Sequence, residues 1–345
     1  MNIKQTLLEL SALSGVAGSG DEAAQHIARL LEPFGQVSQN PLGSVICRVW
    51  EAKPGQPHLL LDAHLDEVGM IVTHIEDSGF LRVSPCGGVD MRALPACPVV
   101  VHGKNGKVTG VVCSTPPHLE QGKEKKFAKV EELYIDIGYT KDQAENLISL
   151  GDRVSVHGPS RVLLGDRVSG KALDNRAGCV SLLYALELLR DVEPRCGLSV
   201  IFSTLEEIGG QGAKTAAHKL EPTHAVVVDV SFAHTPDSNR QKCGLMGKGP
   251  MIGTAPILSG EIARRLIQTA RARGIPYQRE IMAGGTGTNA DHIAATRAGV
   301  LTGLASIPLK YMHTPVEAVA LSDIEETGKL LAGFAQDFGK GGGGQ

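Results

Sequence analysis

The sequence predicts an α/β fold that is interrupted by a small β-rich insertion. Segments typical of strands and helices alternate over residues 1–72 and again over residues 166–338. Between them, over residues 73–165, short β-type runs are separated by glycine and asparagine turns. A chain of 345 residues is long enough for two domains. We therefore expect one discontinuous α/β domain, one inserted β-rich domain and a flexible glycine-rich tail at residues 339–345.

The first α/β segment contains a predicted helix followed by two predicted strands. Apolar side chains recur at helical spacing from Asp21 to Leu31, which places Ala23 and Ile27 on one face. The runs at 44–49 and 58–61 are short and mostly apolar, and they predict strands. These elements open the α/β domain.

The β-rich insertion is predicted from four short runs, PVVVHG, KVTGVVCS, LYIDIG and DRVSVHG. The first two flank Asn105 and Gly106, a dipeptide suited to positive φ at both central positions of a hairpin turn. One helix is expected from Lys141 to Leu150. We therefore expect a small β domain that carries one helix.

Alternation of strands and long helices resumes after Gly165. The predicted helices span 177–189, 212–220 and 261–273, and the predicted strands span 198–205, 225–230 and 300–307. The strand AVVVDV shows no polar alternation, which is typical of a sheet that is covered on both faces.

The composition argues against several classes of partner. The net charge is −3 and no long run of one sign occurs, so there is no electrostatic basis for binding nucleic acid or an anionic membrane. No stretch is long and apolar enough to span a membrane, and no apolar core of a signal peptide follows Met1. The seven cysteines are scattered without a C-x-x-C pair, which favours free thiols in a reducing cytoplasm.

Two adjacent carboxylates, Glu206 and Glu207, follow the apolar run LSVIFSTL and precede a glycine pair. Like charges this close raise each other's pKa unless a cation lies between them. A metal ion bound by one carboxylate would remove this cost, and the other carboxylate could then act as a general base towards a metal-bound water. An exposed acidic pair in a polar loop is the alternative interpretation of the doublet taken alone.

Four further segments place metal-type ligands at strand ends or strand-to-helix turns, where open α/β sheets form their sites. His64 ends an apolar run and could face a metal with Asp66 orienting it, or the pair could be structural. Asp174 precedes a helix and could instead be an ordinary N-cap. Asp229 lies in an apolar strand, where a carboxylate is costly unless it is paired or metal-bound. His313 follows another strand-like run.

Together these segments supply two histidines, three ligand carboxylates and one spare carboxylate. This set fits a co-catalytic dinuclear site, in which each ion takes one histidine and one terminal carboxylate while one aspartate and one water bridge both ions. Zinc, cobalt and manganese all suit such ligands. The residues therefore favour a metal-dependent hydrolase.

The order and context of five motifs resemble those of the M42 family of metallo-aminopeptidases. The motifs are H-x-D-E-V-G, A-L-D-N-R-x-G, E-E-[IV]-G, V-D-V and H-[ST]-P-x-E, and they span nearly the whole chain. The resemblance implies a zinc-exopeptidase-like αβα sandwich with a mixed sheet and an inserted β-barrel-like domain that serves oligomerisation. It also implies a cytoplasmic homo-oligomer, a tetrahedral dodecamer, that removes N-terminal residues from short peptides.

The resemblance further implies two divalent metal ions per subunit, with zinc first and cobalt or manganese as alternatives. The first ion would be held by His64, Asp174 and Asp229. The second ion would be held by Asp174, Glu207 and His313.

The remaining two acidic candidates receive catalytic roles from the same resemblance. Glu206 would be the general base that deprotonates the bridging water and later protonates the leaving amine. Asp66 would orient His64. A cis peptide bond is expected between Asp174 and Asn175, because similar enzymes carry one after the bridging aspartate.

One segment departs from the family pattern. Where many relatives have G-G-T-D-A, this chain reads AGGTGTNADH, with Gly287 at the place of the aspartate and Asp291 further along. The loop lies near the substrate in similar enzymes, so Gly284, Gly285 and Thr286 are candidate substrate-binding residues. The departure bears on substrate preference more than on the metal chemistry.

Three other functions stay open. A metal-dependent deacylase or carboxypeptidase acting on acylated amino acids needs a cation for the substrate carboxylate, whereas an aminopeptidase needs an acidic recess for the free amine. A glycosidase needs two carboxylates across an open cleft, and the 4% aromatic content leaves few residues to stack on sugars. A binding scaffold with structural metals would favour closed cysteine-rich sites and would leave Glu206 without a role.

Overall fold

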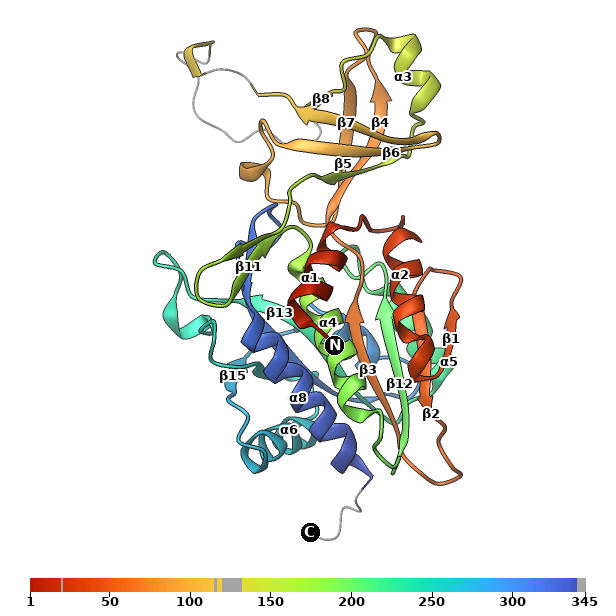
Figure 1. Cartoon of the computed structure of the whole chain (residues 1–345), viewed down its shortest axis with the longest axis vertical. Helices are drawn as coiled ribbons and strands as arrows, with labels where there is room; N and C mark the ends of the chain where they lie inside the picture. The colour runs from red at the N-terminus through yellow and green to blue at the C-terminus, as the bar shows by residue number, and fades with distance from the viewer. Residues whose placement is uncertain (20, 115–116, 120–131, 340–345) are drawn as a thin grey trace.

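The computed structural model describes residues 1–19, 21–114, 117–119 and 132–339. It shows a layered α/β sandwich with a β barrel at one end (Figure 1). The sandwich contains the chain segments on both sides of the barrel segment, so the barrel interrupts it in sequence. The predicted fold class, a mixed-sheet α/β sandwich with a small inserted barrel, is confirmed.

The sandwich is built on a mixed sheet of eleven strands. In pairing order, nine of them are β1 (Gln36–Gln39), β2 (Val45–Trp50), β12 (Gly197–Ser203), β3 (His58–His64), β13 (His224–Phe232), β16 (Leu301–Lys310), β17 (Glu317–Ala320), β11 (Arg167–Gly170) and β10 (Arg161–Leu163). The other two are β14 (Met251–Thr254), which pairs with β16, and β15 (Gln278–Ile281), which pairs with β14. Strands β12, β3, β13 and β16 run parallel, so their carboxyl ends meet at one edge of the sheet.

The central strands are apolar because helices cover both faces of the sheet. Every residue of β12 is buried, and only the first residue of β3 is not. One face packs against α1 (Ile3–Ala12), α2 (Asp21–Leu31), α4 (Leu173–Leu189), α6 (Gly260–Ala272) and α8 (Leu321–Phe338). The other face packs against α5 (Gln211–Leu220) and α7 (Asn289–Ala294). No helix within the described ranges is both long and apolar enough to cross a membrane.

Six antiparallel strands close the barrel. In order they are β4 (Gly69–Ile75), β5 (Leu81–Cys86), β8 (Tyr134–Asp136), β7 (Gly106–Val112), β6 (Pro98–Gly103) and β9 (Arg153–Val156). The barrel has its own apolar core, which includes Met70, Leu81 and Val99, and α3 (Lys141–Leu147) packs on it through Ala144. This core is distinct from the two apolar cores that flank the large sheet.

Two predictions inside the barrel segment hold with corrections. The hairpin forms between β6 and β7, but only Gly106 of the predicted turn pair takes a positive φ, of 123°. The predicted helix begins at Lys141 but ends at Leu147 rather than Leu150, because Ile148 already has extended backbone angles.

Two differences concern the sandwich helices. The helix predicted from 177 begins four residues earlier, at Leu173, with a break in the helical angles directly after its first residue. Helix α8 has no counterpart among the predicted elements. Small residues such as Gly328, which approaches Tyr184 of α4 closely, interrupt its apolar stripe. The predicted flexible tail spans residues 339–345; Gly339 is the C-cap of α8, and residues 340–345 lie outside the described residues.

Candidate metal centre and active site

The parallel strands bring four candidate residues to one edge of the sheet. His64 is the last residue of β3, and Asp229 lies near the end of the neighbouring β13. Glu206 and Glu207 follow β12, the other neighbour of β3, after a turn in which Leu205 has a positive φ of 63°. Residues up to 165 positions apart in sequence thus converge because these strands are adjacent and point the same way.

Two more candidates reach this edge from other elements. Asp174 is the second residue of α4, and its φ and ψ of −79° and 104° are not helical. The peptide bond between Asp174 and Asn175 is cis, as expected. Asp174 is not the N-cap, because that position belongs to Ala172. His313 lies in the loop between β16 and β17 with a φ of 63°.

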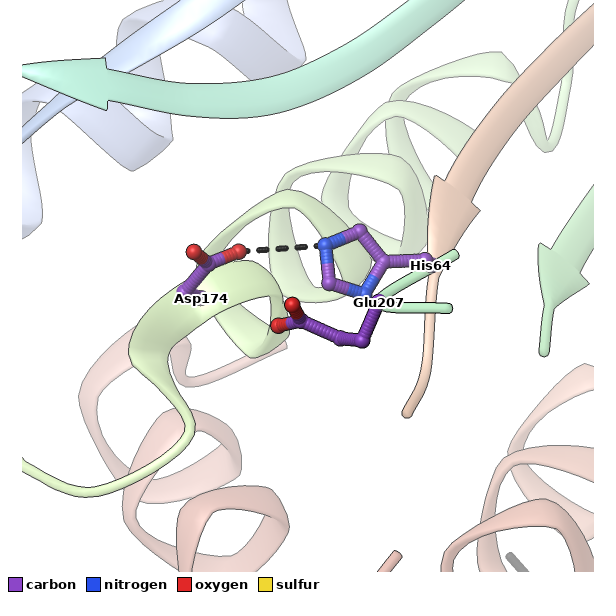
Figure 2. Close-up of side chains that lie close together, drawn as sticks. All are labelled: His64, Asp174 and Glu207. Atoms are coloured by element: carbon purple, nitrogen blue, oxygen red, sulfur yellow. Dashed lines mark hydrogen bonds and ion pairs between the residues drawn. The ribbon is translucent and has the colours of Figure 1, made fainter. Parts of the chain in front are cut away.

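The carboxylate of Asp174 lies between the two imidazoles. Its Oδ1 is 3.0 Å from Nε2 of His64, and its Oδ2 is 3.3 Å from Nε2 of His313. Nε2 of His64 is also 3.5 Å from Oδ1 of Asp229, and Nε2 of His313 is 3.4 Å from Oε2 of Glu207. Figure 2 shows the His64 ring directed at Asp174, with the Glu207 carboxylate beside both.

The opposite nitrogen of each imidazole is held by a backbone carbonyl. Nδ1 of His64 donates to the carbonyl of Asp66 at 3.1 Å, and Nδ1 of His313 donates to the carbonyl of Gly88 at 2.8 Å. A carbonyl can only accept, so each Nδ1 carries the hydrogen. Both Nε2 atoms therefore face the carboxylates and can serve as ligand atoms.

Asp66 contacts more than His64. Its carboxylate accepts the backbone N–H groups of Glu206 and Glu207, at 3.2 and 3.3 Å, while its Oδ1 is 3.7 Å from Nδ1 of His64. The hydrogen bond that orients the imidazole comes instead from the Asp66 main chain. The Asp66 side chain therefore holds the acidic doublet in place behind the ring.

Glu206 is set apart from the other carboxylates by its position. Its side chain is 14% exposed, against 5% for Glu207, and its Oε2 is 4.0 Å from Nε2 of His64. Glu206 thus lies near the cluster but is farther from the imidazoles than the other carboxylates are, and it is the more accessible member of the doublet.

The cluster carries more negative charge than its own residues neutralise. Burial raises the pKa of Glu206 to about 8, with the charge of Asp229 adding to the rise, and burial and Asp174 raise the pKa of Glu207 well above its ordinary value. Burial also acts to raise the pKa of Asp174, but hydrogen bonds with His313 and His64 outweigh it and lower this pKa to about 2. Burial alone would lower the pKa of His64, yet Asp229 and Asp174 raise it well above normal. The imidazoles thus act as the cations of the cluster.

The donor set fits divalent cations. His64, Asp174 and Glu207 each offer one ligand atom, and these atoms lie within 4.8 Å of one another. Imidazole nitrogens and carboxylate oxygens are ligands of zinc and of similar ions. Excess buried negative charge is the condition that a bound cation relieves.

The structure adds Glu317, which was not among the candidate residues although it ends the fifth motif. It is 2% exposed and accepts hydrogen bonds from the backbone of both Asp174 and His313. Its signal in the sequence is a glutamate that begins an apolar strand, EAVA, four residues after a candidate ligand.

The loop with the candidate substrate-binding residues is anchored beside the same edge. Gly284 and Gly285 are exposed, and the carboxylate of Asp291 accepts the backbone N–H of Thr286 at 2.9 Å. The side chain of Asn289, at the start of α7, donates to Asp62 of β3 and to Ser203 of β12. These bonds tie the loop to the two strands that lead to His64 and to the acidic doublet.

Known proteins match this chain over most of its length. The sequence profile described as M42 glutamyl aminopeptidase matches residues 43–330. The lysyl aminopeptidase of Pyrococcus furiosus is 30% identical over 310 residues, which cover 88% of this chain and 87% of that protein.

Solved structures are similar over almost the whole chain. Aminopeptidase APDkam598 from the archaeon Desulfurococcus kamchatkensis is 32% identical with a TM-score of 0.90, covering 97% of this chain and 94% of that one. The TET1 peptidase of Pyrococcus horikoshii, which can assemble into a tetrahedron or a large octahedral shell, is 31% identical with a TM-score of 0.86, covering 97% and 99%. The chain belongs to the M42 family of aminopeptidases and is a hydrolytic exopeptidase.

Proposed function

We propose that this aminopeptidase is a co-catalytic dinuclear metalloenzyme that hydrolyses N-terminal residues from short peptides. The observation that carries the proposal is the Asp174 carboxylate, each oxygen of which faces an imidazole Nε2, with Glu206 left over beside the cluster. One carboxylate between two histidines is what a pair of adjacent ions requires.

The proposed ligands divide into two sets that share one residue. His64, Asp174 and Asp229 would hold the first ion, and Asp174, Glu207 and His313 would hold the second. Zinc is the first choice, with cobalt or manganese as alternatives. Bound ions of this kind polarise a substrate carbonyl, lower the pKa of water and stabilise an oxyanion.

Glu206 is the proposed general base. It accepts a proton from the attacking water and later donates it to the leaving amine, so the peptide bond breaks without a free hydroxide or a free amide anion. The backbone hydrogen bonds from Glu206 and Glu207 to Asp66 support this role, because they fix the main chain that carries the Glu206 side chain relative to the His64 segment. Asp66 is therefore a positioning residue for the base in this proposal.

The charge around the site supports a substrate with a free amine over an acylated one. The nearby Lys171 already donates to both carboxylate oxygens of Glu67, each at 2.9 Å, and to the carbonyl of Leu13. The ammonium group of this lysine already has acceptors for its hydrogens, so it is a poor receptor for the carboxylate that a deacylase or carboxypeptidase substrate would present.

The barrel is proposed to serve self-association. In this proposal the sandwich forms the catalytic domain, and the barrel, strands β4 to β9, forms the domain through which copies of the chain assemble, as a dodecamer in the cytoplasm. The assembly of the TET1 relative into closed shells supports the proposal. A closed shell would admit unfolded short peptides and exclude folded proteins. Contact of Gly284, Gly285 and Thr286 with the substrate is part of the same proposal.

The test is hydrolysis of one leucyl peptide, with its amine free and then acetylated, by enzyme stripped of metal and reloaded with zinc, cobalt or manganese. We expect metal-dependent cleavage of the free form alone. Cleavage of the acetylated form would favour the deacylase. Absence of hydrolysis of both peptides with every metal would contradict the proposed chemistry.

A further inference from the structure

Glu317 is a buried carboxylate that connects two proposed ligands through their main chains. It is the first residue of β17 and is 2% exposed. Its Oε2 accepts the backbone N–H of Asp174 at 3.0 Å, and its Oε1 accepts the backbone N–H of His313 at 2.7 Å. Each carboxylate oxygen thus binds the main chain of a different ligand segment.

These two segments need an external acceptor because their backbones are irregular. Asp174 lies where α4 departs from helical angles, and His313 takes a positive φ of 63°. A buried N–H group left without an acceptor is unfavourable, so both groups favour the conformations in which Glu317 reaches them. The carboxylate therefore defines the separation of two segments that lie 139 positions apart in sequence.

The two proposed ions depend on Glu317 to different degrees. Asp174 and His313 both belong to the set proposed for the second ion. His64 and Asp229 complete the first set, and their backbones lie on strands β3 and β13, which pair with each other in the sheet. Strand pairing therefore holds two of the three ligands of the first set, whereas two of the three ligands of the second set are linked through Glu317.

We propose that Glu317 is a positioning residue that sets the distance between Asp174 and His313 and so determines the affinity of the second metal ion. The proposal rests on the dinuclear function proposed above. In this role the Glu317 side chain acts only through the main chains of Asp174 and His313, so it is neither a metal ligand nor a proton donor in the reaction.

Replacement by glutamine keeps the size of the side chain and removes half of its accepting capacity. An amide has one oxygen and one NH₂ group, so one of the two backbone N–H groups would face a donor. Loss of a partner behind a metal ligand typically costs about 10–100-fold in metal affinity. The Glu317→Gln protein should therefore bind the second ion about 10–100-fold more weakly, and it should bind the first ion, which has only Asp174 of the two linked segments, with a clearly smaller loss.

The experiment is a stepwise zinc titration of the full-length enzyme after its metal has been removed. The affinity for each ion is measured by calorimetry and by competition with a chelating dye. Glu261→Gln, a half-exposed position on α6, is the matched control and should bind both ions normally. His313→Ala removes a proposed ligand and gives the reference for a protein with one intact site. Turnover of a leucyl peptide at rising zinc gives a second readout, because the activity lost by Glu317→Gln should return at high zinc.

The outcomes separate this proposal from the dinuclear function. If Glu317→Gln binds two ions with wild-type affinities, the role of Glu317 is overturned while the dinuclear function stands. Equal weakening of both ions would show a general structural role and would overturn the proposal as well. A wild-type protein that binds fewer than two ions would overturn the dinuclear function. If Glu317→Gln does not fold, Glu317→Asp takes its place, since the shorter carboxylate cannot reach both N–H groups and should show the same selective loss.

Discussion

At the scale of single residues, the site is defined by charge that is buried without enough opposite charge. Four carboxylates surround two imidazoles, and each imidazole is anchored by a carbonyl on its far side. Such an arrangement is unfavourable for folding by itself, since desolvation penalises each charged form. It is the arrangement expected of a site that is completed by a cation.

Removing the proposed base should separate chemistry from metal binding. Glu206→Gln is expected to lower kcat by about 10²–10⁴-fold or more, because proton transfer in the transition state is lost. Metal content, measured by mass spectrometry of the purified protein, should stay at the wild-type level. Near-normal turnover in this variant would refute the assignment of Glu206.

The metal-free protein should lose stability as the pH rises. Burial raises the pKa of Glu206 from its ordinary 4.5 to about 8, so the folded state binds more protons than the unfolded state between these values. Its contribution is thus fully present below about pH 4.5 and is lost as the pH rises through about 8. The raised pKa of His64 acts in the same direction above pH 6.5.

The measurement is the calorimetric Tm at pH 5.5, 7.0 and 8.5, with a chelator and then with zinc. We expect the Tm of the chelated protein to fall across this series, and zinc to raise the Tm most at the highest pH, since its ligands must be deprotonated. A chelated protein whose Tm rises from pH 5.5 to 8.5 would contradict the assigned charge balance.

At the scale of elements, the acidic doublet is positioned by the close approach of α5 to the end of β12. Gly212, the second residue of α5, lies against the backbone of Thr204 and the hydroxyl of Ser44. The hydroxyl of Ser44 in turn accepts the backbone N–H of Thr204 at 3.1 Å. A side chain at position 212 would push the helix away from the turn that carries Glu206.

Adding one methyl group at this contact should therefore damage both stability and activity. Gly212→Ala is expected to cost about 1–3 kcal/mol of unfolding free energy through overpacking, and to lower kcat by displacing the turn. The matched control is Gly260→Ala at the start of α6, where an added methyl meets no atom within 4 Å. That variant should be neutral or up to about 1 kcal/mol more stable in denaturant unfolding. Equal effects of the two changes would show that the contact does not matter.

At the scale of the whole molecule, the barrel and the sandwich meet beside the site. A small cavity of about 20 Å³ is lined by Val68, which precedes barrel strand β4, by Val156 at the end of barrel strand β9, and by Asp174, Glu207 and His313 of the cluster. The carbonyl that orients His313 belongs to Gly88, which follows barrel strand β5. The position of the barrel therefore contributes to the geometry of the site.

The assembly proposed for the barrel has a direct test. Native mass spectrometry should give a species twelve times the mass of the 36.3 kDa chain. Light scattering at micromolar concentration provides an independent mass. A protein that stays monomeric in both measurements would remove the basis for a closed chamber and for selection of unfolded peptides.

Much of the fold follows from the sequence because its determinants are local. Apolar runs without polar alternation predicted the buried central strands, and turn residues between short runs predicted the β-rich insertion. Helix α8 shows the limit, because Gly328 interrupts its apolar stripe for the sake of close packing on α4. That reason exists only once the two helices are placed together.

The sequence by itself determined the types of donor group and their places at strand ends, since an imidazole or carboxylate next to a buried strand is visible in the residue order. The family resemblance shared Asp174 between two ions, and the tertiary structure places it between His64 and His313; only the tertiary structure decided that Glu317 binds the main chain of Asp174 and that Asp66 binds the main chain of Glu206. These contacts join positions more than a hundred residues apart. Their geometry depends on strand order and helix packing, which no local pattern encodes.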